Sequence, residues 1–175
     1  MAFNRKGAES ICAKWTVSKS CSHFDYNIII YALEQNINFL FEELLSKKLL
    51  KNPKKLEQTL FLIAMDAVGG FIKAQDDKFG YGKFKNVKDV FKHVVDLLEY
   101  KGRDYSGKNV AMTGLVGVAT RLMDKVYRLE NLVLNDKKPT NEPTVDTWQD
   151  IVGYAIIGEM VREKLWWSGE EKAKK

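Results

Sequence analysis

Four charged side chains share one face of a helix that the sequence predicts over 114–134. They are Arg121, Asp124, Lys125 and Arg128, at positions i, i+3, i+4 and i+7, which lie on the same side of an α-helix. Arginine offers a planar fork that matches phosphate oxygens, and lysine adds a point charge. The face has two interpretations, a phosphate-binding surface or a solvated set of ion pairs.

Two carboxylates stand one turn apart on the next predicted helix, Asp146 and Asp150, with Tyr154 a further turn along. Mg²⁺ takes oxygen ligands and usually keeps several waters, so a few carboxylates can hold it. If the two helices are antiparallel, we expect Asp124 to approach this pair and to complete a metal site for Mg²⁺, or for Mn²⁺ in its place. Glu142 in the connecting loop would add a ligand or a base. The alternative is that Asp146 only favours the helix N-terminus, where the macrodipole stabilises acids.

A polar segment before these helices, predicted as a loop over 101–109, could add contacts to a phosphate or a base. Its candidate binding residues are Lys101, Asp104, Tyr105, Lys108 and Asn109. Either Tyr105 or Tyr154 would stack on a nucleoside. His23 and His93 have no partners in the order of a catalytic triad, and we interpret both as structural.

Hydrophobic periodicity predicts helices throughout the chain and no strands. We expect an all-α bundle of about five main helices, over 24–50, 53–75, 86–100, 114–134 and 144–167. The pair Gly69 and Gly70 lies inside the second helix and marks either a kink or a close helix contact. Residues 1–22 give the weakest pattern, and 14–17 weakly favours an extended segment.

Composition fits one globular domain: 175 residues, of which 45% are hydrophobic and 29% are charged, so disorder of the whole chain is excluded. Cys12 and Cys21 have neither a disulfide-framework nor a zinc-site spacing. No apolar run reaches the ~18 residues of a membrane span, and no apolar signal core follows Met1. We therefore expect a cytoplasmic protein that does not contact a membrane.

The basic excess is spread along the chain. Residues 1–100 carry 15 Lys/Arg and 12 Asp/Glu, and residues 101–175 carry 13 and 11, which makes +3 and +2 of the net +5. Nucleic-acid binders usually cluster their charge, so this distribution disfavours a nucleic acid partner and suits a small phosphorylated ligand. A third hypothesis, an interaction or nucleic-acid-binding protein, rests on the lysines of 47–55 and on Trp166 and Trp167.

Three blocks of the sequence resemble the nucleotide modification associated domain, type one, a family common in phages and bacteria. Residues 101–107 resemble its K-x-x-D-Y-G motif, residues 117–129 resemble G-V-x-x-R-x-x-D-K-x-x-R-L, and residues 142–155 resemble E-x-x-x-D-T-x-x-D-x-x-x-Y-A. The resemblance divides the chain into an unassigned helical part of the same bundle (1–90), the family domain (91–167) and a charged, frayed tail (168–175).

This family is similar to the all-α nucleoside triphosphate pyrophosphohydrolases, the MazG-like and dimeric dUTPase-like enzymes. The resemblance implies a homo-oligomer, Mg²⁺ held by carboxylates, and hydrolysis between the α- and β-phosphates. Asp146 and Asp150 look like the second acidic motif of those enzymes, and Asp124 looks like a remnant of the first. Arg121 and Lys125 stand where further acids are expected, which is a departure from the pattern.

Two functions follow as expectations. The first is a Mg²⁺-dependent nucleotide-processing protein, similar to a nucleoside triphosphate pyrophosphohydrolase, that acts on a (d)NTP or a modified nucleotide. The alternative is a non-catalytic protein that sequesters a nucleotide, of the kind a phage would use in the host cytoplasm to oppose host nucleotide signalling.

Overall fold

A computed structural model describes residues 3–16, 25–76, 84, 86–104 and 107–166 of the chain. These residues form six α-helices and no strand, so the predicted all-α bundle is confirmed. The helices are α1 (Arg5–Trp15), α2 (Tyr26–Leu45), α3 (Pro53–Asp76), α4 (Val87–Asp104), α5 (Lys108–Leu129) and α6 (Thr144–Arg162). A 3-10 turn (Leu49–Lys51) precedes α3, and a π-helical turn (Glu130–Leu134) follows α5. None of the described helices is long and apolar enough to cross a membrane.

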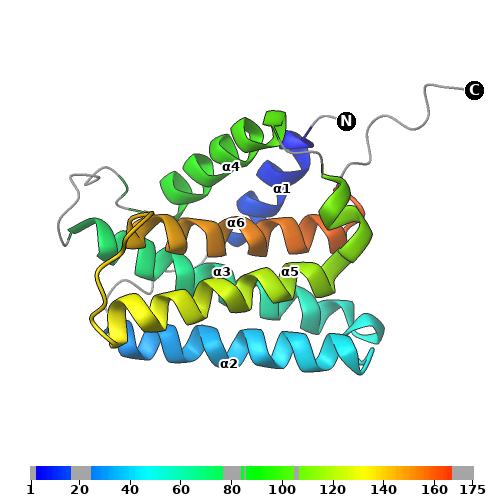
Figure 1. The fold of residues 1–175 in the computed structure, drawn as a ribbon. Helices are drawn as coiled ribbons and strands as arrows, with labels where there is room; N and C mark the ends of the chain where they lie inside the picture. Colours follow the sequence, from blue (N-terminus) through cyan, green and yellow to red (C-terminus); the bar gives the residue numbers. More distant parts are fainter. Residues whose placement is uncertain (1–2, 17–24, 77–83, 85, 105–106, 167–175) are drawn as a thin grey trace, which may run out of the picture.

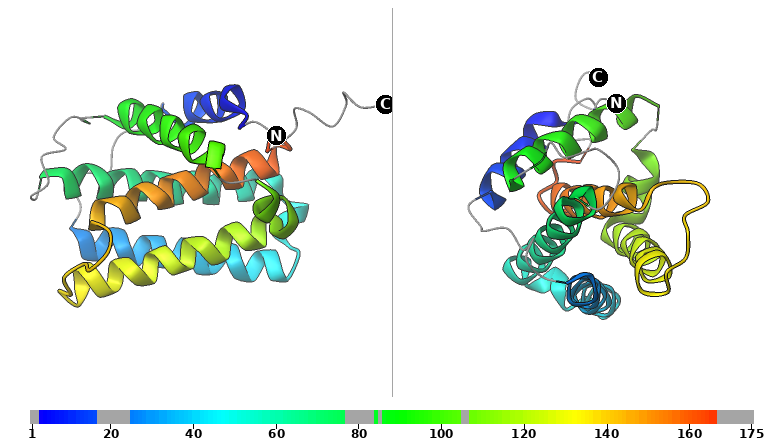
Figure 2. Two further views of the ribbon diagram at one scale, coloured as in Figure 1. Left: turned by 45° about the horizontal axis from the view of Figure 1, so that its top comes forward. Right: turned by 90° about the vertical axis from the view of Figure 1, so that its left-hand side faces the viewer.

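The helices pack in three layers of two, as Figures 1 and 2 show. The middle layer holds α3 and α6, one outer layer holds α2 and α5, and the other holds α1 and α4. Helices α5 and α6 run antiparallel and pack along each other (Figure 1). The condition on which the expected approach of Asp124 to Asp146 and Asp150 depended, an antiparallel pair of helices, is therefore met.

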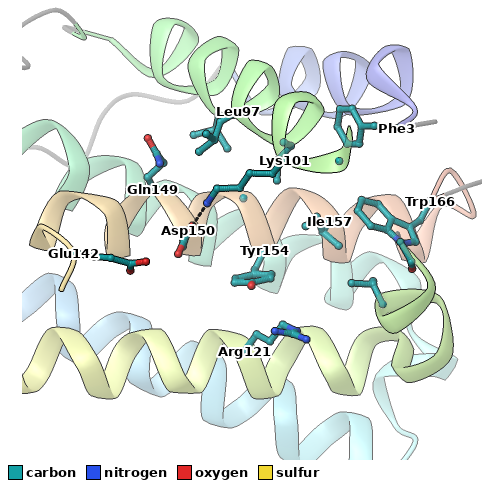
Figure 3. Close-up of a pocket in the computed structure, with 16 residues that line it drawn as sticks. Phe3, Leu97, Lys101, Arg121, Glu142, Gln149, Asp150, Tyr154, Ile157 and Trp166 are labelled. Carbon is teal, nitrogen blue, oxygen red and sulfur yellow. Dashed lines mark hydrogen bonds and ion pairs between the residues drawn. The ribbon is translucent and has the colours of Figure 1, made fainter. Parts of the chain in front are cut away.

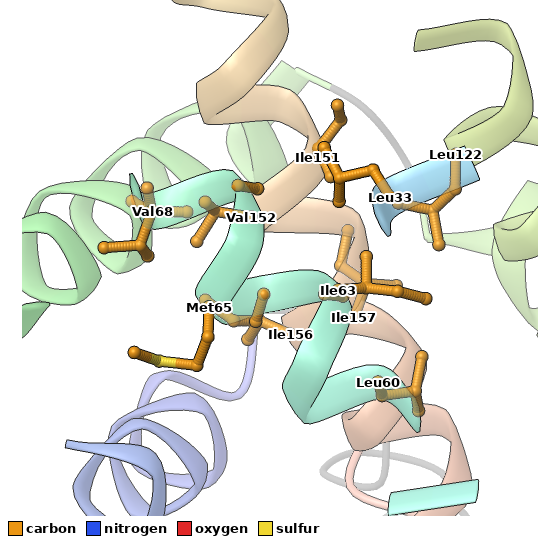
Figure 4. Close-up of a cluster of buried hydrophobic side chains, with 14 of the residues drawn as sticks. Leu33, Leu60, Ile63, Met65, Val68, Leu122, Ile151, Val152, Ile156 and Ile157 are labelled. Atoms are coloured by element: carbon orange, nitrogen blue, oxygen red, sulfur yellow. The ribbon is translucent and has the colours of Figure 1, made fainter. Parts of the chain in front are cut away.

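Helix α6 is buried on almost every side because it lies in the middle layer. Its buried residues include Trp148, Ile151, Val152, Ile156 and Met160, which join side chains of α2, α3 and α5 in one core (Figure 4). A helix that is apolar all round is stable only when it is surrounded. Four polar side chains of α6 form one half-buried stripe, Asp146, Gln149, Asp150 and Tyr154, whereas Thr147 and Glu159 are buried in the core.

Gly70 lets α3 and α6 approach closely. A Cβ atom at this position would lie 2.3 Å from the Cζ3 atom of Trp148, far inside van der Waals contact. Helix α3 continues through both glycines to Asp76. Of the two interpretations of the Gly69–Gly70 pair, the close helix contact is confirmed.

The N-terminal segment is helical, and the extended segment expected over 14–17 is wrong for Lys14 and Trp15. The Asn4 side chain caps α1 by accepting a hydrogen bond from the Gly7 amide at 3.0 Å, as Asn does at helix starts. Ile11 and Trp15, one turn apart, are both buried. Helix α1 has only 11 residues, so its apolar periodicity is too short to be recognised in the sequence.

Two boundaries near the candidate site also differ from expectation. Helix α4 continues to Asp104, so Lys101 lies on a helix and not in a loop. Helix α5 starts at Lys108, but Gly114 interrupts it with φ 57° and ψ −147°, a conformation that favours glycine. The predicted start at residue 114 therefore marks the interruption, beyond which the helix continues regularly.

The division at residues 90 and 91 that the resemblance implies falls inside α4. Helix α3, from the unassigned part, packs along α6 from the family domain. The two parts share one hydrophobic core. The tail, 168–175, lies outside the described residues.

Candidate functional site

Three residues of the polar stripe of α6, Gln149, Asp150 and Tyr154, line a pocket of about 450 Å³ between α4, α5 and α6 (Figure 3). One end of the pocket is apolar and aromatic, with Phe3, Ile157 and Trp166 among its lining residues. The other end carries Lys101 and Asp150. Pockets of this size, with an apolar lining and a few polar groups, are the usual form of small-ligand sites.

Two lysines from different helices converge on the Asp150 carboxylate. Lys101 of α4 places its Nζ 3.1 Å from Oδ1, and Lys125 of α5 places its Nζ 2.6 Å from Oδ2. The Asp150 side chain is 18% exposed and the Lys101 side chain 47%. One carboxylate thus faces two ammonium groups, and the Glu142 carboxylate lines the same pocket.

Arg121 and Tyr154 meet on the α5 side of the pocket. The guanidinium carbon of Arg121 lies 6.0 Å from the centroid of the Tyr154 ring, at the outer limit of a cation–π contact. Both side chains line the pocket (Figure 3). The fold therefore brings two candidate binding residues, one from α5 and one from α6, to the same pocket.

A second pocket, of about 400 Å³, continues the first one along α6. The two pockets share Lys101, Glu142, Gln149 and Asp150, and the second also contains His93. The Nε2 atom of His93 and the Oε1 atom of Gln149 are 2.7 Å apart. His93 thus has a hydrogen-bond partner, as a structural role requires, but it also borders a pocket.

Carboxylates are crowded at the second pocket, which Glu142, Asp146 and Asp150 all line. Partial burial raises the pKa of Asp146, and the negative charges of Glu142 and Asp150 raise it further. Lys101 and Arg128 act in the opposite direction on this pKa.

Arg128 is engaged by the chain segment that leads into α6. It donates hydrogen bonds to the Thr147 hydroxyl and to the backbone carbonyl of Glu142, the latter at 2.6 Å. Its guanidinium also lies 3.8 Å from the Glu142 carboxylate. We infer that Arg128, predicted to bind phosphate, positions Glu142 and the start of α6.

Asp124, the third predicted metal ligand, is exposed on α5. The Asp150 carboxylate is paired with Lys101 and Lys125. Within the described residues, no three His, Cys, Asp or Glu side chains are grouped so that they could hold a metal ion. The Mg²⁺ or Mn²⁺ site expected at Asp124, Asp146 and Asp150 stays a prediction.

Four other predicted residues border the gap between α4 and α5. Asp104 ends α4, and Lys108 and Asn109 begin α5. Tyr105 lies outside the described residues. Their predicted contacts with a phosphate or a base stay predictions.

The aromatic end of the pocket contains residues that the sequence did not connect. Phe3 and Trp166 meet edge to face, with ring centroids 6.3 Å apart, and the Trp166 indole donates to the Gly107 carbonyl at 3.3 Å. Trp166 packs against the bundle, as one interpretation of the tryptophan pair expected. Because Phe3 and Trp166 stand at opposite ends of the described chain, no spacing rule could have paired them.

Comparison of the chain with protein-family models, curated proteins and solved structures gave no match. The resemblance to the nucleotide modification associated domain therefore stays a prediction from three short blocks.

Proposed function

We propose that this protein binds a nucleotide in the pocket between α4, α5 and α6. The phosphate end lies against Lys101, Lys125 and Arg121, and the base lies at the aromatic end. The observation that carries this proposal is the convergence of Lys101 and Lys125 on one carboxylate, Asp150, at the border of an aromatic pocket.

The charges of the cluster support an anionic ligand. Charge-assisted hydrogen bonds from lysine to a carboxylate or a phosphate are stronger than neutral ones. Asp150 already occupies such a position, and a phosphate is an alternative partner for the same ammonium groups. Lys101 is half-exposed, so its side chain can turn to a ligand with little loss of packing.

The other end of the pocket supports a planar, largely apolar group. Tyr154 and Trp166 are the largest aromatic side chains that line it, together with aliphatic residues such as Ile157. Stacking of a base on an aromatic ring contributes about 1–3 kcal/mol. A ligand with an aromatic ring joined to a phosphate matches both ends, and a nucleotide is the simplest such molecule.

Calorimetric titration with AMP, ADP, ATP and pyrophosphate, first in EDTA and then in Mg²⁺, tests this proposal. We expect at least one nucleotide to bind in EDTA and pyrophosphate to bind more weakly than that nucleotide. Lys125→Met should weaken nucleotide binding about 5- to 10-fold, because it removes a cation from a partly buried site. Lys54→Met, at an exposed position of α3, makes the same change of charge and should leave the affinity unchanged.

The proposal is contradicted if no nucleotide binds to the folded protein, or if both lysine variants lose affinity equally. Equal losses would mean that only the net charge of the protein matters. A thermal melt of each variant verifies that it is folded.

Hydrolysis is a second candidate function, and the crowding of Glu142, Asp146 and Asp150 at one pocket favours it. Mutual repulsion of carboxylates is a common property of sites that bind a divalent cation. Incubation of a panel of NTPs and dNTPs with Mg²⁺, followed by detection of pyrophosphate, tests this function. Turnover that Asp146→Asn abolishes would support it, and no turnover of any substrate by the folded protein would exclude it for that panel.

A further inference from the structure

The pocket of the proposed function is one half of a longer groove. A second compartment, of about 400 Å³, adjoins the first, of about 450 Å³, and both are lined by Lys101, Gln149 and Asp150. The Lys101–Asp150 ion pair, which Figure 3 shows in the first compartment, lines both compartments and therefore lies where they meet. A mononucleotide bound as proposed would occupy only the first compartment.

The second compartment has the side chains to receive another planar ring. The His93 ring lies nearly parallel to Phe71, with centroids 6.1 Å apart and an angle of 18°, and its centroid is 4.7 Å from that of Phe84. His93 and Phe71 both line the compartment, but Phe71 is only 2% exposed and His93 is half-buried, so His93 is the ring that a base would meet. Aromatic surfaces of this kind stack on bases with little dependence on base identity.

The charges of the second compartment disfavour further phosphates. Glu142 lines both compartments and Asp146 lines the second alone, so an extra phosphate in the second compartment would meet one more carboxylate than it would in the first. The same carboxylates accept hydrogen bonds from exocyclic amino groups, as acids do when they bind cytosine in DNA. The compartment thus suits a base that carries an amino group better than it suits a polyphosphate chain.

We propose that the natural ligand is a dinucleotide, two nucleosides joined through phosphate, that spans both compartments. The linking phosphate lies at Lys101 and Lys125, one base lies against Tyr154 and Trp166, and the second lies against His93 with its amino group toward Asp146. This inference rests on the proposed function, because it uses the same cation cluster for the phosphate. The observation that carries the dinucleotide inference is the position of one basic cluster, Lys101 and Lys125, between two compartments that both contain aromatic side chains.

Calorimetry with AMP and with the dinucleotides ApA and UpU tests the inference. We expect ApA to bind at least about tenfold more tightly than AMP, the increment of one added stacked base. ApA should also bind more tightly than UpU, because uracil has no exocyclic amino group.

Two variants separate the second compartment from the first. His93→Ala should reduce the ratio of ApA affinity to AMP affinity toward one. Asp146→Asn, a nearly isosteric change that preserves the shape of the compartment, should reduce the preference for ApA over UpU. Asp146→Asn removes one of several crowded carboxylate charges, so we expect this variant to fold. It therefore tests the second compartment even if His93→Ala does not fold.

The outcomes distinguish the two proposals. AMP binding with no gain for ApA overturns the dinucleotide inference and leaves the proposed function intact, whereas no binding of AMP, ApA or UpU overturns both. The inference is also overturned if folded His93→Ala keeps the full gain of ApA over AMP and Asp146→Asn keeps the full preference for ApA over UpU, since the second base would then lie elsewhere.

Discussion

Asp150 is the residue that sets the electrostatics of the pocket. Its carboxylate holds Lys101 and Lys125 from two different helices, so it orders both cations before any ligand arrives. Helical spacing placed Asp150, Lys125 and Arg121 on the facing sides of their helices. Lys101 was expected in a loop, but it lies in the last turn of α4.

A second residue, Asp66 on α3, predicts a pH dependence of stability. Burial raises its pKa to about 6, against a hydrogen bond from Asn36 that lowers it. The folded state therefore binds a proton more tightly than the unfolded state, and this stabilisation is present below the ordinary carboxyl pKa. It is lost as the pH rises through about 6, since ionised Asp66 is partly buried.

Chemical unfolding at pH 4 and pH 7 tests this effect. Asp66→Asn should raise the free energy of unfolding at pH 7 by about 1–2 kcal/mol relative to wild type, with a smaller gain at pH 4. Asp124→Asn, which changes an exposed acid of α5, should show no such difference. Equal effects of Asp66→Asn at the two pH values would contradict the raised pKa.

At the scale of elements, the contact of α3 with α6 depends on Gly70. Its position leaves no room for a Cβ beside Trp148, a buried ring that cannot move easily. We expect Gly70→Ala to destabilise the protein by about 1–3 kcal/mol through overpacking, although alanine favours helix formation.

Gly153→Ala is the matched control, because it makes the same change inside α6. A Cβ there would lie 3.4 Å from Leu98 Cδ2, an ordinary contact, so its melting temperature should stay close to that of wild type. A Gly70→Ala protein as stable as the Gly153→Ala protein would mean that the close contact does not constrain the bundle.

The sequence predicted the helices with long apolar stripes and missed features that depend on tertiary contacts. Helix α3 begins at the expected Pro53, because Asn and Pro are strong start signals. Helix α1 was missed because it is short. The aromatic end of the pocket could not be predicted, since the contact between Phe3 and Trp166 depends on the packing of α1 and α4 over α6.

At the scale of the whole molecule, one outer layer presents apolar side chains on α2. Ile28, Tyr31 and Leu45 are 54%, 63% and 59% exposed. Helix α2 contains no Lys or Arg. Gln35 and Glu42 are exposed between these residues on the same side of the helix, so the apolar surface is concentrated at the start of α2. Exposed apolar side chains often mark an interface, and we expect the homo-oligomer that the resemblance implies to form through Ile28 and Tyr31.

Light scattering at micromolar concentration tests the oligomeric state. Tyr31→Glu should lower the measured mass, because it buries a charge in the interface. Tyr100→Glu, at a tyrosine of α4 that is equally exposed, should leave it unchanged. A monomer mass for the wild-type chain would contradict this expectation.

The affinity of Asp150→Asn for a nucleotide is the most direct test of the role of the cation cluster. Loss of the carboxylate frees Lys101 and Lys125 for the phosphate, so we predict binding in EDTA that is about 5- to 10-fold tighter than wild type. Asp124→Asn, the same change of charge at an exposed site on α5, should alter the affinity much less. Weaker binding by Asp150→Asn, or equal gains in both variants, would contradict the assignment of these lysines to the phosphate.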